Sequence, residues 1–257
     1  MTVKIAVAGA KGRMGQLIID EVKRFEDLEL VAGFDVRGAG DPLGGGVLVS
    51  DASKLAEVLK RSGAEVLIDF TTPVATVENV RVAADLGVNL VVGTTGLTED
   101  QKTEIGRSVD GKVAAVISPN FSVGVNLFWK LIEVAARSLE GYDIEVIEAH
   151  HRNKMDAPSG TAMEAVRVLA EATGKREAVH GREGQGLRGD EIGVHAVRAG
   201  DIVGDHTVLF AGPGERLEIK HQAHSRQAFA SGAVRAARWV TAVPSGVYAM
   251  ANVLGQK

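Results

Sequence analysis

Residues 148–162, "EAHHRNKMDAPSGTA", concentrate groups that could bind an anion and exchange a proton with it. The cations of this stretch are His150, His151, Arg152 and Lys154. They precede a Pro-Ser-Gly-Thr step that is typical of a helix start, where the N–H groups of Ser159, Gly160 and Thr161 would lack partners. Cations beside a helix N-terminus favour a carboxylate ligand, and a histidine with a pKa of about 6.5 can exchange protons at neutral pH. The stretch therefore predicts a carboxylate site with acid/base chemistry.

Two other interpretations of this stretch stay open at this point. One is a solvated basic loop followed by a capped helix, because charge clusters are usually surface features. The other is a metal site, which fits less well. His150 and His151 end an expected strand, so their side chains should point to opposite faces and cannot readily chelate one ion. We expect no metal.

A second candidate site is the glycine-rich run "GAKGRMG" near the N-terminus, with Gly9, Gly12 and Gly15 between an expected strand and an expected helix. Glycines at this spacing permit a tight turn, close approach of the backbone to a pyrophosphate and close packing of the helix. The helix N-terminus adds positive potential for phosphate groups. A purely structural turn is the alternative. The context favours dinucleotide binding.

Asp35 ends the second expected strand, where an acid can accept hydrogen bonds from the ribose hydroxyls of a dinucleotide. Its charge should disfavour a 2′-phosphate, whereas Lys11, Arg13 and Arg37 lie close enough in the sequence to offset that repulsion. The pattern therefore favours NADH, with NADPH tolerated.

Further strand ends place polar residues along the expected cofactor path. These ends are "DFTTP" (69–73), "GTTG" (93–96) and "SPNFSVGVN" (118–126), and threonines in such turns can alternatively cap helices. Asn120 could hydrogen-bond a nicotinamide carboxamide. The complete set of predicted cofactor-binding residues is Gly9, Ala10, Lys11, Gly12, Arg13, Met14, Asp35, Gly93, Thr94, Thr95, Ser118, Pro119, Asn120 and Phe121.

The elements that position these residues follow from hydrophobic periodicity. Apolar strands near 3–9, 28–35, 64–70, 88–94 and 112–118 alternate with helical stretches near 12–25, 53–61, 73–86 and 98–109. This alternation predicts a parallel sheet covered on both faces, with ligands at the carboxyl ends of the strands. We therefore expect an α/β protein with a Rossmann-type domain.

From about residue 122 the pattern changes to a smaller α/β domain with a mixed sheet. A long helix precedes the strand 142–150, a second helix begins near Pro158, and three closely spaced strands follow. Residues 174–190 are glycine-rich and predict a mobile surface loop, either a lid or disorder. We expect domains at 1–121 and 122–230, with a helical segment 231–257 packing back on the first domain.

Composition limits the class of protein. The chain has 257 residues, 45% hydrophobic and 24% charged, with a net charge of -4 and no cysteine. The charge gives no basic footprint for nucleic acid or membrane, and the absence of cysteine excludes disulfides and thiolate chemistry. The glycine-rich N-terminus does not resemble a signal peptide. We expect a cytoplasmic enzyme.

The quoted motifs, together with "GDIVGDHTVLFAGPGERLEI" and "HSRQAFASGA", resemble the dihydrodipicolinate reductase family of lysine and diaminopimelate biosynthesis. The resemblance extends from residue 9 to about 233, and "HHRNKMDAPSGTA" is its most specific part. It implies NADH- or NADPH-dependent reduction of 4-hydroxy-tetrahydrodipicolinate, a small dicarboxylate, to tetrahydrodipicolinate with loss of water. It also implies a homotetramer whose subunit contacts lie in the second domain.

The resemblance implies a role for five residues of the basic stretch. His150 would be the acid/base and Lys154 the proton donor, and the substrate carboxylates would be held by His151, Gly160 and Thr161. Many relatives have Arg where this chain has Val36, and His where it has Asn153. The first departure puts 2′-phosphate binding in doubt, and the second suggests that residue 153 is not essential.

Two other classes of protein share the glycine turn. A two-domain dehydrogenase of a small amino or keto acid, such as an aspartate dehydrogenase, has no need of the His-His-x-x-Lys and Ser-Gly-Thr arrangement. A redox-sensing regulator that binds NAD(P) would usually carry a basic surface for nucleic acid or a protein partner.

Overall fold

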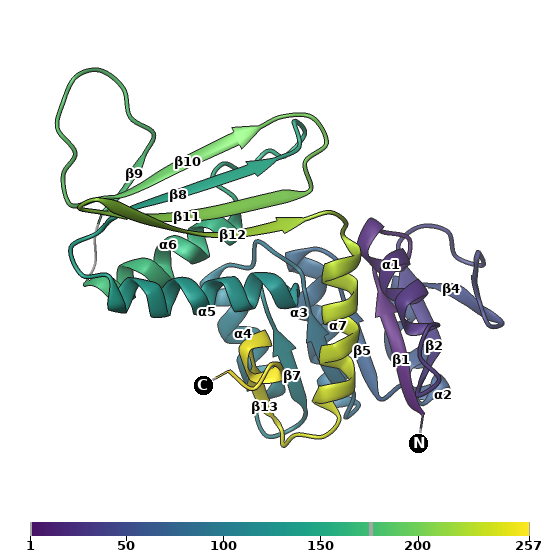
Figure 1. Ribbon diagram of the computed structural model, residues 1–257. Helices are drawn as coiled ribbons and strands as arrows, with labels where there is room; N and C mark the ends of the chain where they lie inside the picture. Colours follow the sequence, from purple (N-terminus) through teal and green to yellow (C-terminus); the bar gives the residue numbers. More distant parts are fainter. Residues whose placement is uncertain (1, 175–176, 257) are drawn as a thin grey trace. The chain divides into compact units, whose positions relative to one another are not determined.

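The computed structural model describes residues 2–174 and 177–256 (Figure 1). The chain forms two compact units, Met1–Val123 with Gln227–Lys257, and Gly124–Arg226. Each unit has its own sheet and its own apolar core.

The first unit contains an eight-stranded sheet. In spatial order its strands are β13 (Gly246–Tyr248), β7 (Ala114–Ile117), β6 (Asn89–Val92), β5 (Val66–Asp69), β1 (Val3–Ala8), β2 (Leu28–Asp35), β4 (Val47–Asp51) and β3 (Pro42–Gly44). All neighbours are parallel except β3 and β4. The predicted Rossmann-type parallel sheet is confirmed, and the carboxyl ends of β1, β2, β5, β6 and β7 share one edge. The sequence patterns did not predict β3, β4 or β13.

Helices cover both faces of this sheet, because successive strand residues alternate between two apolar clusters. Ile5 and Val7 of β1 pack in the cluster that includes α1 (Arg13–Val22), α7 (Gln227–Val240) and α8 (Met250–Val253). The intervening Ala6 and Ala8 pack in the cluster with α2 (Leu55–Ser62), α3 (Pro73–Asp85) and α4 (Glu99–Val109). A short 3-10 helix, η1 (Ala52–Lys54), leads into α2.

Polar contacts attach the C-terminal segment to this unit. Glu21 of α1 is buried and accepts hydrogen bonds from the side chains of Gln227 and Ser231 of α7. A side chain at Gly232 would overlap the carbonyl oxygen of Phe121, so α7 lies directly against that backbone. The returning segment thus begins at α7.

The second unit contains a five-stranded mixed sheet, with α5 (Val123–Ser138) and α6 (Gly160–Thr173) on one face (Figure 1). In spatial order the strands are β12 (Glu215–Ala223), β11 (Gly204–Gly212), β8 (Asp143–His150), β10 (Ile192–Arg198) and β9 (Ala178–His180). The β8–β10–β9 part is parallel and the β8–β11–β12 part is antiparallel. The core contains Phe128, Val146, Leu169 and Phe210.

The prediction that 174–190 is entirely a loop is wrong for the described part of that segment. Residues 178–180 form β9, which pairs with β10. Arg188 donates to Asp143 Oδ1 at 3.0 Å and to Glu145 Oε1 at 3.1 Å, and its side chain is only 19% exposed. Residues 175 and 176 lie outside the described residues. The prediction of a lid or of disorder missed strand β9 and the contacts of Arg188, because glycines dominate the local sequence pattern.

Candidate active site

The turn between β1 and α1 requires glycine at positions 9 and 15 and leaves little room for a side chain at position 12. Gly9 has φ +80°, and a Cβ there would lie 2.6 Å from the carbonyl oxygen of Phe70. A Cβ on Gly12 would lie 3.0 Å from the Gly9 oxygen, and one on Gly15 would overlap that oxygen. Gly12 is the N-cap of α1, with no side-chain cap and no acidic residue in the first turn. The helix N-terminus therefore presents backbone donors, as the phosphates of a dinucleotide require.

Asp35 lies at the carboxyl end of β2 and is hydrogen-bonded to the glycine turn. Its Oδ2 accepts from the Lys11 N–H at 2.9 Å, and its Oδ1 accepts from the Arg37 N–H at 3.1 Å. The carboxylate is thus held beside the turn. Lys11, which is expected to help offset this charge, has its Nζ in an ion pair with Asp41 Oδ2 at 2.6 Å.

The threonine-rich strand ends form an internal network around Asp69. This carboxylate is fully buried and accepts from the hydroxyl groups of Thr71 at 2.7 Å, Thr76 at 3.0 Å and Thr94 at 3.1 Å. Thr72 accepts from the Ala75 N–H as the N-cap of α3. The hydroxyl groups of Thr71 and Thr94 are therefore directed at Asp69, and the place of Thr94 in the cofactor site stays a prediction. Asp69 fixes the shape of both loops.

The remaining predicted cofactor residues also gather at the carboxyl edge of the parallel sheet. Asn120 Oδ1 accepts from the Ser122 N–H at 2.9 Å, and its carbonyl oxygen accepts from the Ser118 hydroxyl at 2.8 Å, which closes the turn after β7. Around this edge lie Ala10, Arg13, Met14, Gly93, Thr95, Pro119 and Phe121. Of these, Arg13, Thr95 and Pro119 are exposed.

In the second unit, His150 ends β8 with its side chain buried on the face of the sheet that α5 and α6 cover. Nδ1 of His150 lies 2.6 Å from Oε2 of Glu148, which is two residues earlier on the same face. Arg198 of β10 donates to both oxygens of Glu148, at 2.8 and 2.7 Å. His151 follows the end of β8 and is half-buried. The opposite orientation of the two histidines stays a prediction from the two-residue period of the strand.

The start of α6 differs in one respect from the prediction. Ser159 is the buried N-cap, its hydroxyl accepts from the Ala162 N–H at 3.2 Å, and its own N–H donates to Glu148 Oε1 at 3.0 Å. Ser159 therefore does not offer its N–H to a ligand. Gly160 is exposed at the first helical position, where no intrahelical acceptor exists for the N–H, and Thr161 follows it.

Lys154 lies in the loop between His151 and the helix start. Its N–H donates to the carbonyl oxygen of His151 at 3.0 Å, and its Nζ lies 2.9 Å from Oδ1 of Asp156. The side chain of Lys154 is 23% exposed, whereas that of Asp156 is 58% exposed. The loop therefore places the lysine next to the histidines, with an exposed carboxylate as its present partner.

Burial and nearby charges set the protonation of this cluster. Burial lowers the pKa of His150, together with the charges of Lys154 and Arg198 and against the contact with Glu148. Burial raises the pKa of Glu148, but the hydrogen bonds from Arg198, His150 and Ser159 outweigh it, so that this pKa lies below its usual value. His206 of β11 packs edge-on against His150, and burial lowers its pKa to about 3.

Sequence patterns missed three members of this cluster. Glu148 stands two residues before His150, and the two-residue period of a strand puts both on one face, so this signal was available. Arg198 and His206 are distant in sequence and reach the site only through strand pairing. Only the strand register could have revealed them.

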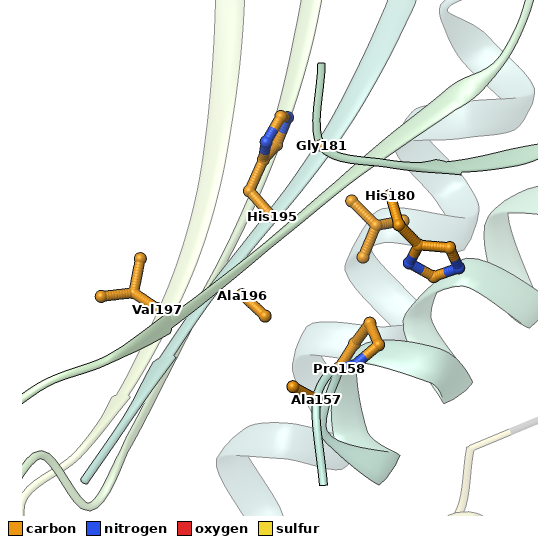
Figure 2. A pocket seen from close by; sticks show the side chains of 8 residues that line it. Ala157, Pro158, His180, Gly181, His195, Ala196 and Val197 are labelled. Carbon is orange, nitrogen blue, oxygen red and sulfur yellow. The ribbon is translucent and has the colours of Figure 1, made fainter. Parts of the chain in front are cut away.

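A separate pocket of about 480 Å³ lies at the edge of β10 where β9 has ended (Figure 2). Pro158, His180, His195 and Val197 are among its lining residues. None of the residues predicted to act on the substrate lines it. Within residues 2–174 and 177–256, no group of three or more histidine, aspartate or glutamate side chains could hold a metal ion. The same residues include no helix long and apolar enough to cross a membrane.

Comparison with known proteins identifies relatives along the whole chain. Two family models match, one described as dihydrodipicolinate reductase, N-terminus, over residues 3–121, and one as dihydrodipicolinate reductase, C-terminus, over residues 124–254. A 4-hydroxy-tetrahydrodipicolinate reductase of Methanosarcina barkeri is 56% identical, covering 98% of this chain and 99% of that protein. The corresponding protein of Methanothermobacter thermautotrophicus is 51% identical, with coverage of 98% and 99%.

Solved structures agree with the sequence comparison. A dipicolinate-bound dihydrodipicolinate reductase from Paenisporosarcina sp. TG-14 has a TM-score of 0.82 and 30% identity, covering 98% of this chain and 99% of that one. An amine dehydrogenase from Mycobacterium smegmatis has a TM-score of 0.62 at 15% identity, covering 96% of this chain and 94% of that one, which shows a shared fold alone.

Proposed function

This chain belongs to the dihydrodipicolinate reductase family, and on that premise we propose how its residues perform the family's reaction. The reaction is the reduction of 4-hydroxy-tetrahydrodipicolinate, with loss of water, to tetrahydrodipicolinate in lysine and diaminopimelate biosynthesis. The reductant is a nicotinamide dinucleotide.

The dinucleotide binds to the first unit in this proposal. Gly9, Gly12 and the N-terminus of α1 hold the pyrophosphate, and Asp35 accepts the ribose hydroxyls. The oriented carboxylate of Asp35 and the pairing of Lys11 with Asp41 support NADH as the preferred nucleotide, with NADPH also used. The bound nucleotide supplies the hydride, and the turn after β7 at Asn120 receives the nicotinamide carboxamide.

The dicarboxylate substrate binds to the second unit, at the start of α6. The Gly160 N–H, Thr161 and His151 hold its carboxylates, and Lys154 and His150 transfer the proton. A substrate carboxylate replaces the exposed Asp156 as the partner of Lys154, because it carries the same charge. The single observation that carries this proposal is that the loop between β8 and α6 brings together His150, Lys154 and the N-terminus of α6.

The test is oxidation of NADH and of NADPH by the purified protein, with freshly made product of dihydrodipicolinate synthase as substrate. We expect oxidation with both nucleotides and a lower KM for NADH. The absence of oxidation with either nucleotide would refute the assigned activity. Equal KM values would refute only the proposed preference.

We further propose that the protein is a homotetramer assembled through the second unit. The β8–β10 face opposite α5 and α6 is uncovered (Figure 1), and its side chains Ile147 and Val197 are 41% and 45% exposed. Exposed apolar side chains on an uncovered sheet favour burial against another subunit. Light scattering should give a mass four times that of the 27.0 kDa chain. A monomer mass would refute this assembly.

A cytoplasmic location is also part of the proposal. A reaction that consumes reduced nicotinamide nucleotide needs a supply of it, and a chain without cysteine gains nothing from an oxidising compartment. Fractionation of cells that produce the protein, followed by assay of NADH oxidation in each fraction, tests the location.

A further inference from the structure

Glu148 is the hydrogen-bond partner of the His150 ring. The Glu148 side chain is fully buried. Its Oε2 lies 2.6 Å from His150 Nδ1 and 2.8 Å from Arg198 Nη1. Its Oε1 accepts from Arg198 Nη2 at 2.7 Å and from the Ser159 N–H at 3.0 Å. Three N–H donors, two from Arg198 and one from Ser159, therefore bind the carboxylate, and His150 Nδ1 is its fourth polar neighbour, in a place that water does not reach.

This arrangement decides which atom carries the shared proton. The two N–H donors of Arg198 and the N–H of Ser159 keep this carboxylate ionised, in agreement with its lowered pKa, so Glu148 carries no proton of its own. The proton between Glu148 and His150 must then belong to Nδ1 of the imidazole. A neutral imidazole with Nδ1 protonated has Nε2 as its basic atom.

The ring has few other orientations available. A Cβ on Gly204 would lie 3.1 Å from Nε2 of His150, so the glycine leaves room for that nitrogen. The His206 ring packs edge-on with its centroid 5.1 Å from that of His150. A flip of the His150 ring would break its bond to Glu148 and leave a buried carboxylate with one donor fewer, which is costly.

We propose that Glu148 is a positioning residue that keeps His150 protonated at Nδ1 and presents Nε2 as the atom that exchanges a proton with the substrate. This inference rests on the proposed function, because it concerns the acid/base role of His150. Arg198 balances the charge of Glu148. The carboxylate therefore stabilises the imidazolium less, and the imidazolium can still release its proton. The lowered pKa of His150 agrees with such a balance, since burial and the charges of Lys154 and Arg198 outweigh the effect of Glu148.

The proton step itself is simple. The Nε2–H bond of the imidazolium breaks and the proton joins the substrate. The ring becomes neutral, and its Nδ1–H stays hydrogen-bonded to Glu148. The proton on Nε2 is then restored from solvent. Glu148 stays ionised throughout, and its role is to hold the ring and its tautomer.

The chain offers a matched control on the same strand. Glu145 also pairs with a histidine, His195 Nε2 at 2.8 Å, and with an arginine, Arg188 Nε at 3.1 Å, but on the opposite face of β8. Glu148→Gln keeps the shape and removes the charge at the proposed position, and Glu145→Gln makes the same change at the other. Circular dichroism and thermal melting establish that both variants are folded.

The kinetic experiment compares kcat, KM and the pH profile of kcat for the wild type and both variants. We expect Glu148→Gln to lower kcat by about 10- to 100-fold and to shift the pH profile, with KM for NADH unchanged, whereas Glu145→Gln should leave kcat unchanged. The charged and titratable groups that face His150 are Glu148, Arg198, Lys154 and His206, and only the first is altered. A folded Glu148→Gln protein with wild-type kcat and pH profile would overturn the proposal.

A spectroscopic measurement on the wild-type protein tests the same inference without relying on activity. In the full-length wild-type protein labelled with ¹⁵N-histidine, the signals of His150, assigned by their loss in His150→Gln, should show a protonated Nδ1 and an unprotonated Nε2. The opposite tautomer would overturn the proposal. If the wild type failed to oxidise NADH or NADPH, the proposed function would fail, whereas the tautomer would still be decided here.

Discussion

Lys11 Nζ lies 2.6 Å from Oδ2 of Asp41, while the Lys11 N–H donates to Asp35 at 2.9 Å. The two carboxylates thus hold Lys11 by its side chain and by its backbone. The Lys11 ammonium, one of the three cations expected to offset the charge of Asp35, is thus already paired with a carboxylate. If Asp35 accepts the ribose hydroxyls as proposed, this pairing favours NADH, because only Arg13 and Arg37 are left to receive a 2′-phosphate.

The first prediction is that Asp41→Asn improves the use of NADPH. The change removes the partner of Lys11 and keeps the shape of the side chain. Because the ion pair is partly exposed, we expect a gain of about 0.2–1 kcal/mol, which is roughly a 1.4-fold to fivefold lower KM for NADPH. The KM for NADH should stay the same, since its ribose carries no phosphate. A parallel change for both nucleotides would contradict the explanation.

The second prediction concerns Asp35 itself. Asp35→Ala should weaken NADH more than NADPH, because only the unphosphorylated ribose relies on the carboxylate as an acceptor. The loss of one charge-assisted hydrogen bond is worth about 1.5–3 kcal/mol. Asp51→Ala is a suitable control, since Asp51 is directly opposite Asp35 at the end of the neighbouring strand β4. KM values that move equally for both nucleotides would exclude the assignment.

The third prediction separates chemistry from binding in the basic stretch. His150→Ala and Lys154→Ala should each lower kcat by about 100-fold or more, the usual range for a lost proton-transfer group. Thr161→Ala should chiefly raise the KM of the dicarboxylate. The exposed loop residue Asn153 provides a control as Asn153→Ala. If all three variants raised KM with kcat intact, the cluster would be only an anion site.

The fourth prediction uses inhibitors. Pyridine-2,6-dicarboxylate should compete with the substrate, and picolinate, which has one carboxylate, should bind more weakly by about 1–3 kcal/mol. Higher salt should weaken the dicarboxylate more than the monocarboxylate, because more charge is screened. Inhibition constants for both compounds at two ionic strengths provide the measurement. Equal constants would mean that the stretch is a solvated loop.

The fifth prediction concerns the stability of the protein in acid. In the unfolded chain His206 takes up a proton at a pH of about 6.5, whereas burial lowers its pKa to about 3 in the folded protein. Between these values only the unfolded state holds the proton, so the free energy of unfolding should fall as the pH falls, by about 1.4 kcal/mol per pH unit at most from this group.

The variant His206→Asn removes this contribution. Urea unfolding of the wild type and of this variant between pH 7 and pH 4 should therefore show a shallower pH dependence for the variant. The exposed His180 on β9 gives the control His180→Asn, which should keep the wild-type slope. Identical slopes for His206→Asn and the wild type would mean that His206 is protonated in the folded protein.

Much of the first unit was predictable because its signals are local. Strands such as Val66–Asp69 are continuous apolar runs bounded by turns, and the glycine spacing marks a turn in which a side chain at Gly9 or Gly15 would clash with the backbone. The short strands β3, β4 and β13 were missed, because edge pairing with β2 and β7 stabilises them more than their own sequence does.

For the site, the residue types of 148–162 were enough to predict anion binding and proton exchange, since charge and helix-start chemistry are properties of the local sequence. The hydrogen-bond partners of His150 and Ser159 could not be predicted in this way. The burial of Glu148, its pairing with Arg198 across 50 residues, and the contact of His150 with His206 arise from the register of β8 with β10 and β11. Strand register depends on packing of the whole sheet against α5 and α6, so only the tertiary structure decided that Ser159 donates inward and that His150 is held by a buried carboxylate.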